Sequence, residues 1–262
     1  MNTKHQFKFA THFVMTKARI VITMLGFFLI ALYIVQLALC IIRMKGEFWD
    51  AGANTKESLY QFFGPGLMVN YLAYFTNQTL ILSMAFGILM MIPVFRNHKR
   101  TNTFGVIVLG SCIFEIIIYW MSILANLAPA LKPDSAIAWA VSITEHVFEP
   151  LAVIGLFVCS ILFQSSLTKI KFKNMILYSL IHPTILSIYV VALNFIPLTY
   201  GNDVYPNGFS LYGPLTNCNP MNTQQGSGTY LNLLLVLALY AVIIGFCCSF
   251  WAIDKLRYKI KH

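Results

Sequence analysis

The amino-acid sequence predicts an all-α, polytopic membrane protein whose six transmembrane helices form one bundle. The chain has 262 residues, of which 58% are hydrophobic and only 10% are charged. Its mean hydropathy of +0.71 exceeds that of ordinary water-soluble domains of this length. Six apolar runs are each long enough to cross about 30 Å of hydrocarbon as a helix. These runs are continuous rather than alternating, which excludes a transmembrane β-barrel.

Turn formers and charged residues separate the apolar runs. No Ser/Pro-rich linker or block of charge divides the chain, so residues 1–262 are predicted to form a single domain. The predicted spans are 20–42, 67–95, 104–131, 137–167, 175–198 and 230–253.

The basic residues indicate how the spans are oriented. The two terminal tails hold four Lys and Arg residues each, and the second and fourth loops hold three each, so these segments carry 14 of the 18. Short loops rich in Lys and Arg stay in the cytoplasm. We therefore expect a plasma-membrane protein with cytoplasmic N- and C-termini, in which the long loop containing Cys218 faces outward.

The net charge of +9 does not indicate a nucleic-acid partner. The basic residues form short clusters beside apolar runs rather than one polar face, and topology explains them. The six cysteines form no CxxC pair and lie apart from the histidines. No structural metal site or disulfide framework is expected.

Polar residues at membrane depth are the candidates for function, because a charge placed there costs about 3 kcal/mol or more. In the second predicted span, four consecutive polar residues run from Thr76 through Asn77 and Gln78 to Thr79. A single Thr in a membrane helix usually bonds its own backbone. The polar neighbours favour a further role for this segment.

The fourth predicted span contains a second polar cluster, formed by Glu145, His146 and Glu149. Their spacings of three and four residues allow all three side chains to share a broad helix face. In an alternative reading the helix begins near Val147, which leaves Glu145 and His146 in the headgroup region. The sequence leaves both readings open.

Glu115 and His182 are the other polar residues expected inside the membrane. A carboxyl group in the middle of a span is expected to be protonated or paired. His182 precedes Pro183, which interrupts helical hydrogen bonding and bends a helix. For both side chains, hydrogen bonding between helices is favoured over chemistry.

The first two polar clusters are expected to lie at the same depth in the membrane. Thr76 and His146 each lie nine residues beyond the predicted start of a span that runs inward from outside, or about 13 Å at 1.5 Å per residue. This reckoning allows them to face each other in the outer leaflet.

At these residues the chain resembles the androgen-induced-protein family of six-helix membrane hydrolases, in particular its bacterial relatives. The shared elements are Tyr74 to Gln78, His146 followed by Pro150, and Tyr205-Pro206 with Phe209. The resemblance implies a threonine hydrolase of esters of fatty acids, with Thr76 as nucleophile and His146 as general base. The sequence of this chain departs from that of the animal members around both residues.

The other catalytic roles follow from position and chemistry. A secondary hydroxyl needs a nearby base to attack an ester. Glu149, one turn from His146, is expected to orient the imidazole, and Asn77 or Gln78 to donate a hydrogen bond to the oxyanion. Such an enzyme needs no cofactor and no metal. Its partners are membrane lipids and a small amphiphilic substrate.

Three alternative functions are also compatible with the sequence. A metal enzyme would need Glu115 or His182 to join the Glu145, His146 and Glu149 cluster. A substrate-binding or transport subunit suits six spans with a polar interior, although the sequence has no ATP-binding loop and would need a partner for ATP drive. A non-catalytic membrane protein predicts that replacing Thr76 or His146 alters only stability.

Overall fold

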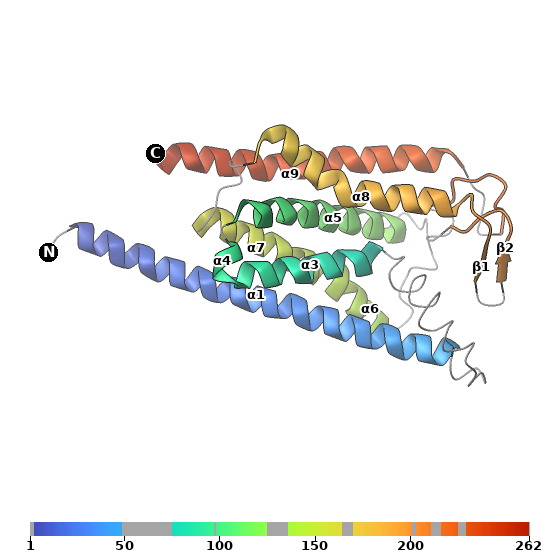
Figure 1. The fold of residues 1–262 in the computed structure, drawn as a ribbon, viewed down its shortest axis with the longest axis horizontal. Coiled ribbons are helices and arrows are strands. Elements are labelled where there is room, and N and C mark those ends of the chain that lie inside the picture. The colour runs from blue at the N-terminus through green and yellow to red at the C-terminus, as the bar shows by residue number, and fades with distance from the viewer. Residues whose placement is uncertain are drawn as a thin grey trace.

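The computed structural model describes residues 3–48, 75–96, 98–124, 136–163, 170–200, 203–210, 216–224 and 229–261. Helices dominate these residues, as Figure 1 shows. Their bounds are α1 Thr3–Phe48, α3 Phe75–Met91, α4 Pro93–Arg96, α5 Lys99–Leu124, α6 Ala136–Ile143, α7 Glu149–Phe163, α8 Phe172–Leu193 and α9 Leu231–Lys261. A π-helical segment, η4 (Thr144–Phe148), joins α6 to α7, and β1 (Leu198–Tyr200) pairs antiparallel with β2 (Asp203–Tyr205).

Five of the helices contain a segment long and apolar enough to span a membrane. These segments are Lys17–Leu39, Lys99–Trp120, Trp139–Cys159, Phe172–Leu193 and Leu237–Leu256. The shorter apolar helix α3 has 17 residues, or roughly 25 Å at 1.5 Å per residue. The fold confirms the prediction of an all-α polytopic membrane protein.

Several predicted boundaries are wrong. The fifth span ends at Leu193 rather than 198, because Pro197 has no N–H to continue a helix and residue 198 begins β1. The third predicted span begins too late, since α5 starts at Lys99. The start of the second predicted span, 67–74, lies outside the described residues.

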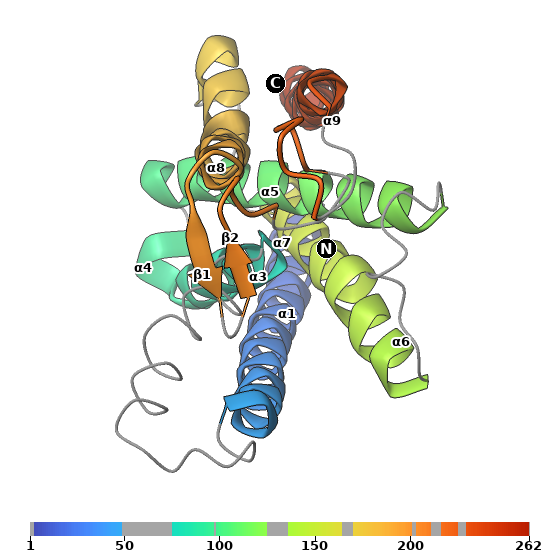
Figure 2. The same cartoon turned by 90° about the vertical axis from the view of Figure 1, so that its right-hand side faces the viewer.

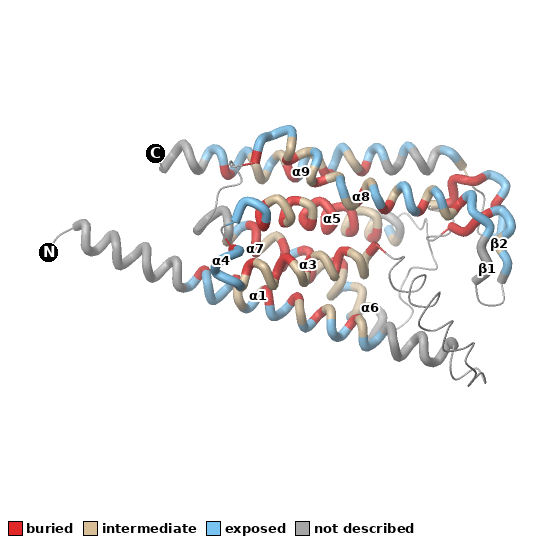
Figure 3. The backbone as a smooth tube through the Cα atoms, viewed as in Figure 1, coloured by how far each residue is buried: buried red, intermediate tan, exposed pale blue. Residues whose placement is uncertain are grey.

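Helix α5 lies at the centre of the bundle. It packs against α3, α7, α8 and α9, while α1 packs against α3 and α7; Figure 2 shows the arrangement end-on. Within its spanning segment 61% of the residues are buried, against 22% for α8 and for α9. Figure 3 shows buried residues concentrated on α3 and α5.

The outer faces of the peripheral helices are apolar. Large side chains such as Met24 of α1, Leu177 and Ile188 of α8, and Leu234 of α9 are all at least 60% exposed. In water such a surface would favour aggregation. In a bilayer these side chains contact lipid, so the pattern is that of a membrane bundle.

Helix α5 approaches α8 closely at a glycine. A Cβ on Gly110 would collide with the backbone carbonyl of Ser179. Small residues allow such close backbone contacts between membrane helices. Gly110 therefore fixes how near the central helix lies to α8.

The segment after α8 is anchored over the end of that helix. The Asn194 side chain donates to the carbonyls of Val190 and Thr216, and its Oδ1 accepts from the backbone N–H of Cys218. Gly208 adopts φ of 90°, a conformation that side chains with a Cβ disfavour. These contacts bury Cys218, which is 2% exposed.

Candidate functional site

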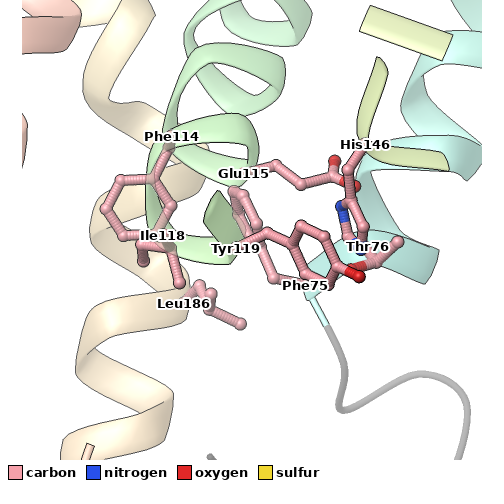
Figure 4. Close-up of a pocket in the computed structure, with 8 residues that line it drawn as sticks. All are labelled: Phe75, Thr76, Phe114, Glu115, Ile118, Tyr119, His146 and Leu186. Carbon is pink, nitrogen blue, oxygen red and sulfur yellow. The ribbon is translucent and has the colours of Figure 1, made fainter. Parts of the chain in front are cut away.

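A small cavity lies inside the bundle where α3, α5, η4 and α8 meet. Its volume is about 40 Å³, which is enough for a water molecule, since one needs about 10–15 Å³. Figure 4 shows the side chains around it. They are Phe75, Thr76, Phe114, Glu115, Ile118, Tyr119, His146 and Leu186.

His146 is the central polar group of the cavity. Its side chain is buried, and its Nδ1 lies 3.0 Å from Oε1 of Glu115, although the contact lacks the alignment of a hydrogen bond. The ring of Tyr119 stacks on the imidazole, with centroids 3.5 Å apart and planes 19° apart. Two groups of α5 therefore hold the imidazole in place.

The π-helical segment gives His146 its position. The backbone N–H of Glu149 donates to the carbonyl of Thr144, five residues earlier, and Pro150 follows with no N–H and with a ring that would clash with the carbonyl of residue 146 in a regular helix. The wider turn removes that conflict. Because the chain is helical from Ala136 onward, the alternative in which the helix begins near Val147 is wrong.

Polar side chains continue below the cavity in a second layer. Ser83 of α3, Cys112 of α5 and Glu149 of α7 are all fully buried. The Ser83 hydroxyl lies 3.6 Å from the Cys112 sulfur and also faces the Glu149 carboxyl. Regular helical spacings of four and three residues align Ser83 with Thr79 on α3 and Cys112 with Glu115 on α5.

His182 belongs to a separate network on the α8 side. Its Nδ1 lies 2.8 Å from the Ser111 hydroxyl and its Nε2 2.9 Å from Oε1 of Gln78. Phe75 stacks on the same ring. The predicted role of His182, hydrogen bonding between helices, agrees with these contacts.

The structure brings together two of the predicted site residues, Thr76 and His146. Asn77 and Gln78 follow Thr76 on α3 but are not among the residues that line the cavity, and Gln78 contacts His182 instead. Glu149 faces Ser83 rather than the imidazole. The acid beside His146 is Glu115, so Glu115 takes the position that the sequence assigned to Glu149.

Sequence reasoning did not identify Glu115 and Tyr119 as cavity residues. Both lie on the face of α5 that also carries Cys112. Glu115 is the only acidic residue in the third predicted span, and comparing its depth with that of His146 could have indicated the pairing. The stacking of Tyr119 depends on packing that no spacing rule gives.

Metal-binding chemistry has limited support in this site. Within the described part of the chain, no group of three His, Cys, Asp or Glu side chains is placed to hold a metal ion. Glu145 comes no closer to His146 than 3.9 Å, between Oε2 and Nε2. The three-residue ligand cluster considered from sequence is not formed in these residues.

Comparison with known proteins adds little to this geometry. A family model described as "Protein of unknown function (DUF1600)" matches residues 138–261, which include His146 and Glu149 but neither Thr76 nor Glu115. Neither the comparison with curated proteins nor that with solved structures gives a match.

Proposed function

We propose that the chain is an intramembrane hydrolase of fatty-acid-type esters, with Thr76 as nucleophile and His146 as general base. The observation that carries the proposal is that Thr76 and His146 line one cavity while Glu115 lies 3.0 Å from the imidazole. Nucleophile, base and an acid that orients the base are the recurring parts of such sites. The resemblance to the androgen-induced-protein family assigns the first two residues the same roles.

Glu115 acts as the positioning residue. A carboxylate at Nδ1 favours the tautomer that carries its proton there, which leaves Nε2 to accept the proton of Thr76. The stacked Tyr119 ring limits rotation of the imidazole. His146 therefore presents one defined nitrogen to the cavity.

The reaction proceeds through an acyl-enzyme. Thr76 Oγ1 attacks the ester carbonyl as Nε2 takes the hydroxyl proton; the tetrahedral intermediate then expels the alcohol oxygen, which receives that proton from the imidazolium. Water next attacks the acyl-threonine with His146 again as base, releasing the fatty acid and restoring Thr76. No cofactor takes part.

Tyr119 is the best-placed donor for the oxyanion. Its hydroxyl is buried, Ser142 of α6 is a neighbouring polar group, and the residue lines the cavity. A buried donor directed at developing negative charge contributes about 3 kcal/mol. This assignment replaces Asn77 and Gln78, which lie outside the cavity lining.

The substrate is a small amphiphilic ester that enters from the membrane. The cavity of about 40 Å³ holds only the reacting ester group, so an acyl chain must part the apolar side chains around it. Phe114, Ile118 and Leu186 supply that apolar wall. Lateral entry suits a substrate dissolved among membrane lipids.

The orientation proposed for the chain places both termini in the cytoplasm of a plasma-membrane protein. In Figure 1 the N-terminal end of α1, the C-terminal end of α9 and the α4–α5 junction lie at one end of the bundle, opposite β1 and β2. The basic clusters of these segments thus share one side, as the positive-inside rule requires of cytoplasmic segments.

Labelling with a hydroxyl-directed fluorophosphonate, together with turnover of a fluorogenic fatty-acid ester, tests the proposal. Wild-type protein should be labelled at Thr76 and should turn over the ester. Thr76→Ala should lose labelling and nearly all turnover, and His146→Ala should lose about 10²- to 10⁴-fold in rate, the usual contribution of a general base.

Thr23→Ala is the matched control. Thr23 also lies on a membrane helix, but its hydroxyl bonds the carbonyl of Arg19, so this variant should keep wild-type labelling and turnover. Gel filtration in detergent checks the folding of each variant. Full turnover by folded Thr76→Ala would refute the mechanism, and unlabelled, inactive wild-type protein would favour a substrate-binding or transport subunit.

A further inference from the structure

An aromatic and basic cluster lies where α8 begins and α9 ends. The Trp251 indole donates from Nε1 to the carbonyl of Ile170, 3.2 Å away, and the ring of Phe172 packs against it with centroids 5.0 Å apart. The ammonium group of Lys255 lies over the same indole, 4.6 Å from the ring centroid. Trp251 therefore joins the two helices and holds one lysine in place.

The cluster lies at the edge of the membrane. Phe172 is the first residue of the spanning segment Phe172–Leu193, and Lys255 is the last but one of the segment Leu237–Leu256. The ends of spanning segments lie at the depth of the phospholipid headgroups. The charged groups of the cluster are therefore within reach of headgroup phosphates.

The surface of the cluster is positively charged. Lys171 and Lys173 flank Phe172, and both are exposed, as is Lys255. Among the described residues, none of these three lysines makes an ion pair. The acid beside Lys255 in the chain, Asp254, is 1% exposed and already has an interaction. Because Lys171 lies between two residues that contact Trp251, its backbone passes beside the indole, and the surface around this ring favours an anion.

Anchoring of the helices at the interface explains only part of this arrangement. An interfacial tryptophan usually directs its N–H toward the wet side, whereas the N–H of Trp251 is bound to the carbonyl of Ile170. The donors left for a headgroup are the ammonium groups of the lysines. The indole serves instead as a fixed surface beneath Lys255.

Apolar surface continues from the cluster toward the middle of the membrane. Leu177 of α8 is 62% exposed and Phe246 of α9 is 52% exposed. A soluble anion would satisfy the lysines but would leave this surface without a partner of its own. A phospholipid carries its phosphate and its acyl chains in one molecule and can contact both.

We propose that Lys171, Lys173, Trp251 and Lys255 form a binding site for the headgroup of an anionic phospholipid. Basic pockets between membrane helices bind such headgroups. The lysines bind the phosphodiester, and the acyl chains lie along the apolar surface of α8 and α9. The cation–π contact positions Lys255 in advance, so less side-chain freedom is lost when the lipid binds. The site goes beyond the proposed hydrolysis and does not depend on it.

Quenching of tryptophan fluorescence by brominated lipids tests the site, because bromine quenches only at close range. The purified full chain is reconstituted in phosphatidylcholine vesicles with increasing fractions of brominated phosphatidylglycerol or brominated phosphatidylcholine. The chain has four tryptophans, so the Trp251 signal is the difference between each protein and its Trp251→Phe counterpart. Brominated phosphatidylglycerol should quench this signal at a mole fraction at least about fivefold lower, the usual contribution of one basic residue near an anionic headgroup.

Lys255→Gln and Arg19→Gln separate the site from general attraction by charge. Lys255→Gln removes the charge over the indole and should reduce the preference for phosphatidylglycerol about fivefold. Adding Lys171→Gln and Lys173→Gln should abolish what remains. Arg19 is exposed near the start of the spanning segment Lys17–Leu39 of α1, and α1 lies across the bundle from α9 (Figures 1 and 2). Arg19→Gln should therefore keep the wild-type preference. Gel filtration in detergent checks the folding of each variant.

Four outcomes would overturn the site. Equal quenching of wild-type Trp251 by the two brominated lipids would show an interfacial anchor without lipid preference. A wild-type preference in Lys255→Gln would place the lipid elsewhere, and an equal loss in Arg19→Gln would show attraction by overall charge. Loss of the preference in inorganic phosphate, but not in NaCl of equal ionic strength, would show that the lysines bind free phosphate.

Discussion

The chemistry of His146 depends on what surrounds its ring. Tyr119 covers one face, Glu115 lies at Nδ1, and Glu145 lies near Nε2. Burial on this scale excludes bulk water, which strengthens each electrostatic interaction. An imidazole held this way can exchange a proton only with a nearby group, and the residues that line the cavity include two with hydroxyls, Thr76 and Tyr119.

Glu115→Gln tests whether the acid positions the base. Gln keeps the volume of the side chain but loses the charge that fixes the imidazole tautomer, so kcat should fall about 10²- to 10⁴-fold. KM should change by less than about threefold, because Glu115 is assigned no contact with the acyl chain. Steady-state kinetics on folded protein measure both constants.

Two outcomes for Glu115→Gln would contradict this positioning role. Unchanged kcat in the folded variant would remove Glu115 from the catalytic site. A variant that never folds, alongside folded Glu115→Asp, would show instead that the bundle itself requires an ionised group there.

Cys218 offers a second test at the residue scale. Burial raises the pKa of its thiol, and only the thiolate reacts with maleimides. At pH 7 the reactive fraction is therefore smaller than for an exposed thiol, whose pKa is about 8.5, and the rate should still climb above pH 9. In purified protein, Cys218 should react at least about tenfold more slowly than Met221→Cys.

Met221→Cys is the matched comparison, because Met221 lies in the same segment and is 72% exposed. Mass spectrometry of proteolytic peptides assigns each modification to its residue. Equal rates and equal pH profiles at the two positions would mean that Asn194 does not hold this segment closed over Cys218.

At this scale, the sequence could indicate Thr76 and His146 because polar residues are rare in apolar runs. It could not choose between Glu115 and Glu149 as the partner of His146. That choice follows from the π-helical turn before Glu149, which changes the direction of every side chain after it. Regular helical spacing assumes no such turn.

Helix α5 organises the elements because it touches every other long helix except α1 among the principal contacts. One polar face of α5 meets α3 and η4, where Glu115 contacts His146. The other polar face meets α8, where Ser111 contacts His182. The close approach of α8 depends on Gly110, where no side chain intervenes. Packing of this helix therefore fixes both polar networks.

Gly110→Ala should destabilise the bundle. Its new Cβ would meet the backbone of Ser179, which cannot rotate away, and overpacking of this kind costs about 1–3 kcal/mol. We expect the unfolding temperature in detergent to fall by about 2–12 °C, at about 2–4 °C per kcal/mol.

Gly245→Ala is the control for Gly110→Ala. Gly245 also lies within a spanning helix, and a Cβ there would meet nothing within 4 Å. This variant should match or slightly exceed the wild type, since Ala favours helix over Gly. Equal unfolding temperatures for the two variants would contradict the close α5–α8 contact.

The apolar runs predicted the existence of the helices well, because length and composition alone decide whether a segment can span hydrocarbon. They could not predict helix ends. Helix α1 extends far beyond the apolar run at 20–42, since its flanking polar residues also favour helix. The π-helical segment η4 likewise cannot be recognised from hydropathy.

The whole molecule is polarised along its length. One end carries the helix ends with clustered Lys and Arg, and the other carries β1, β2 and the asparagine-rich segment that packs over α8 (Figure 1). Hydropathy and charge predicted that the two ends differ in this way, whereas the packing order of the helices depends on contacts such as that of Gly110. Two cysteine substitutions, one at each end, can test which end faces outward.

Met221→Cys and His98→Cys should differ in access from outside the cell. Met221 lies in the segment proposed to face outward, and His98 is exposed near the α4–α5 junction at the opposite end. An impermeant maleimide should modify Met221→Cys in intact cells and His98→Cys only after the membrane is opened. Neither substitution alters the Lys and Arg distribution that sets orientation. Buried Cys218 should contribute little in either case, and the wild type measures that background. Modification of His98→Cys in intact cells, with Met221→Cys protected, would reverse the orientation and place the cavity nearer the cytoplasmic leaflet.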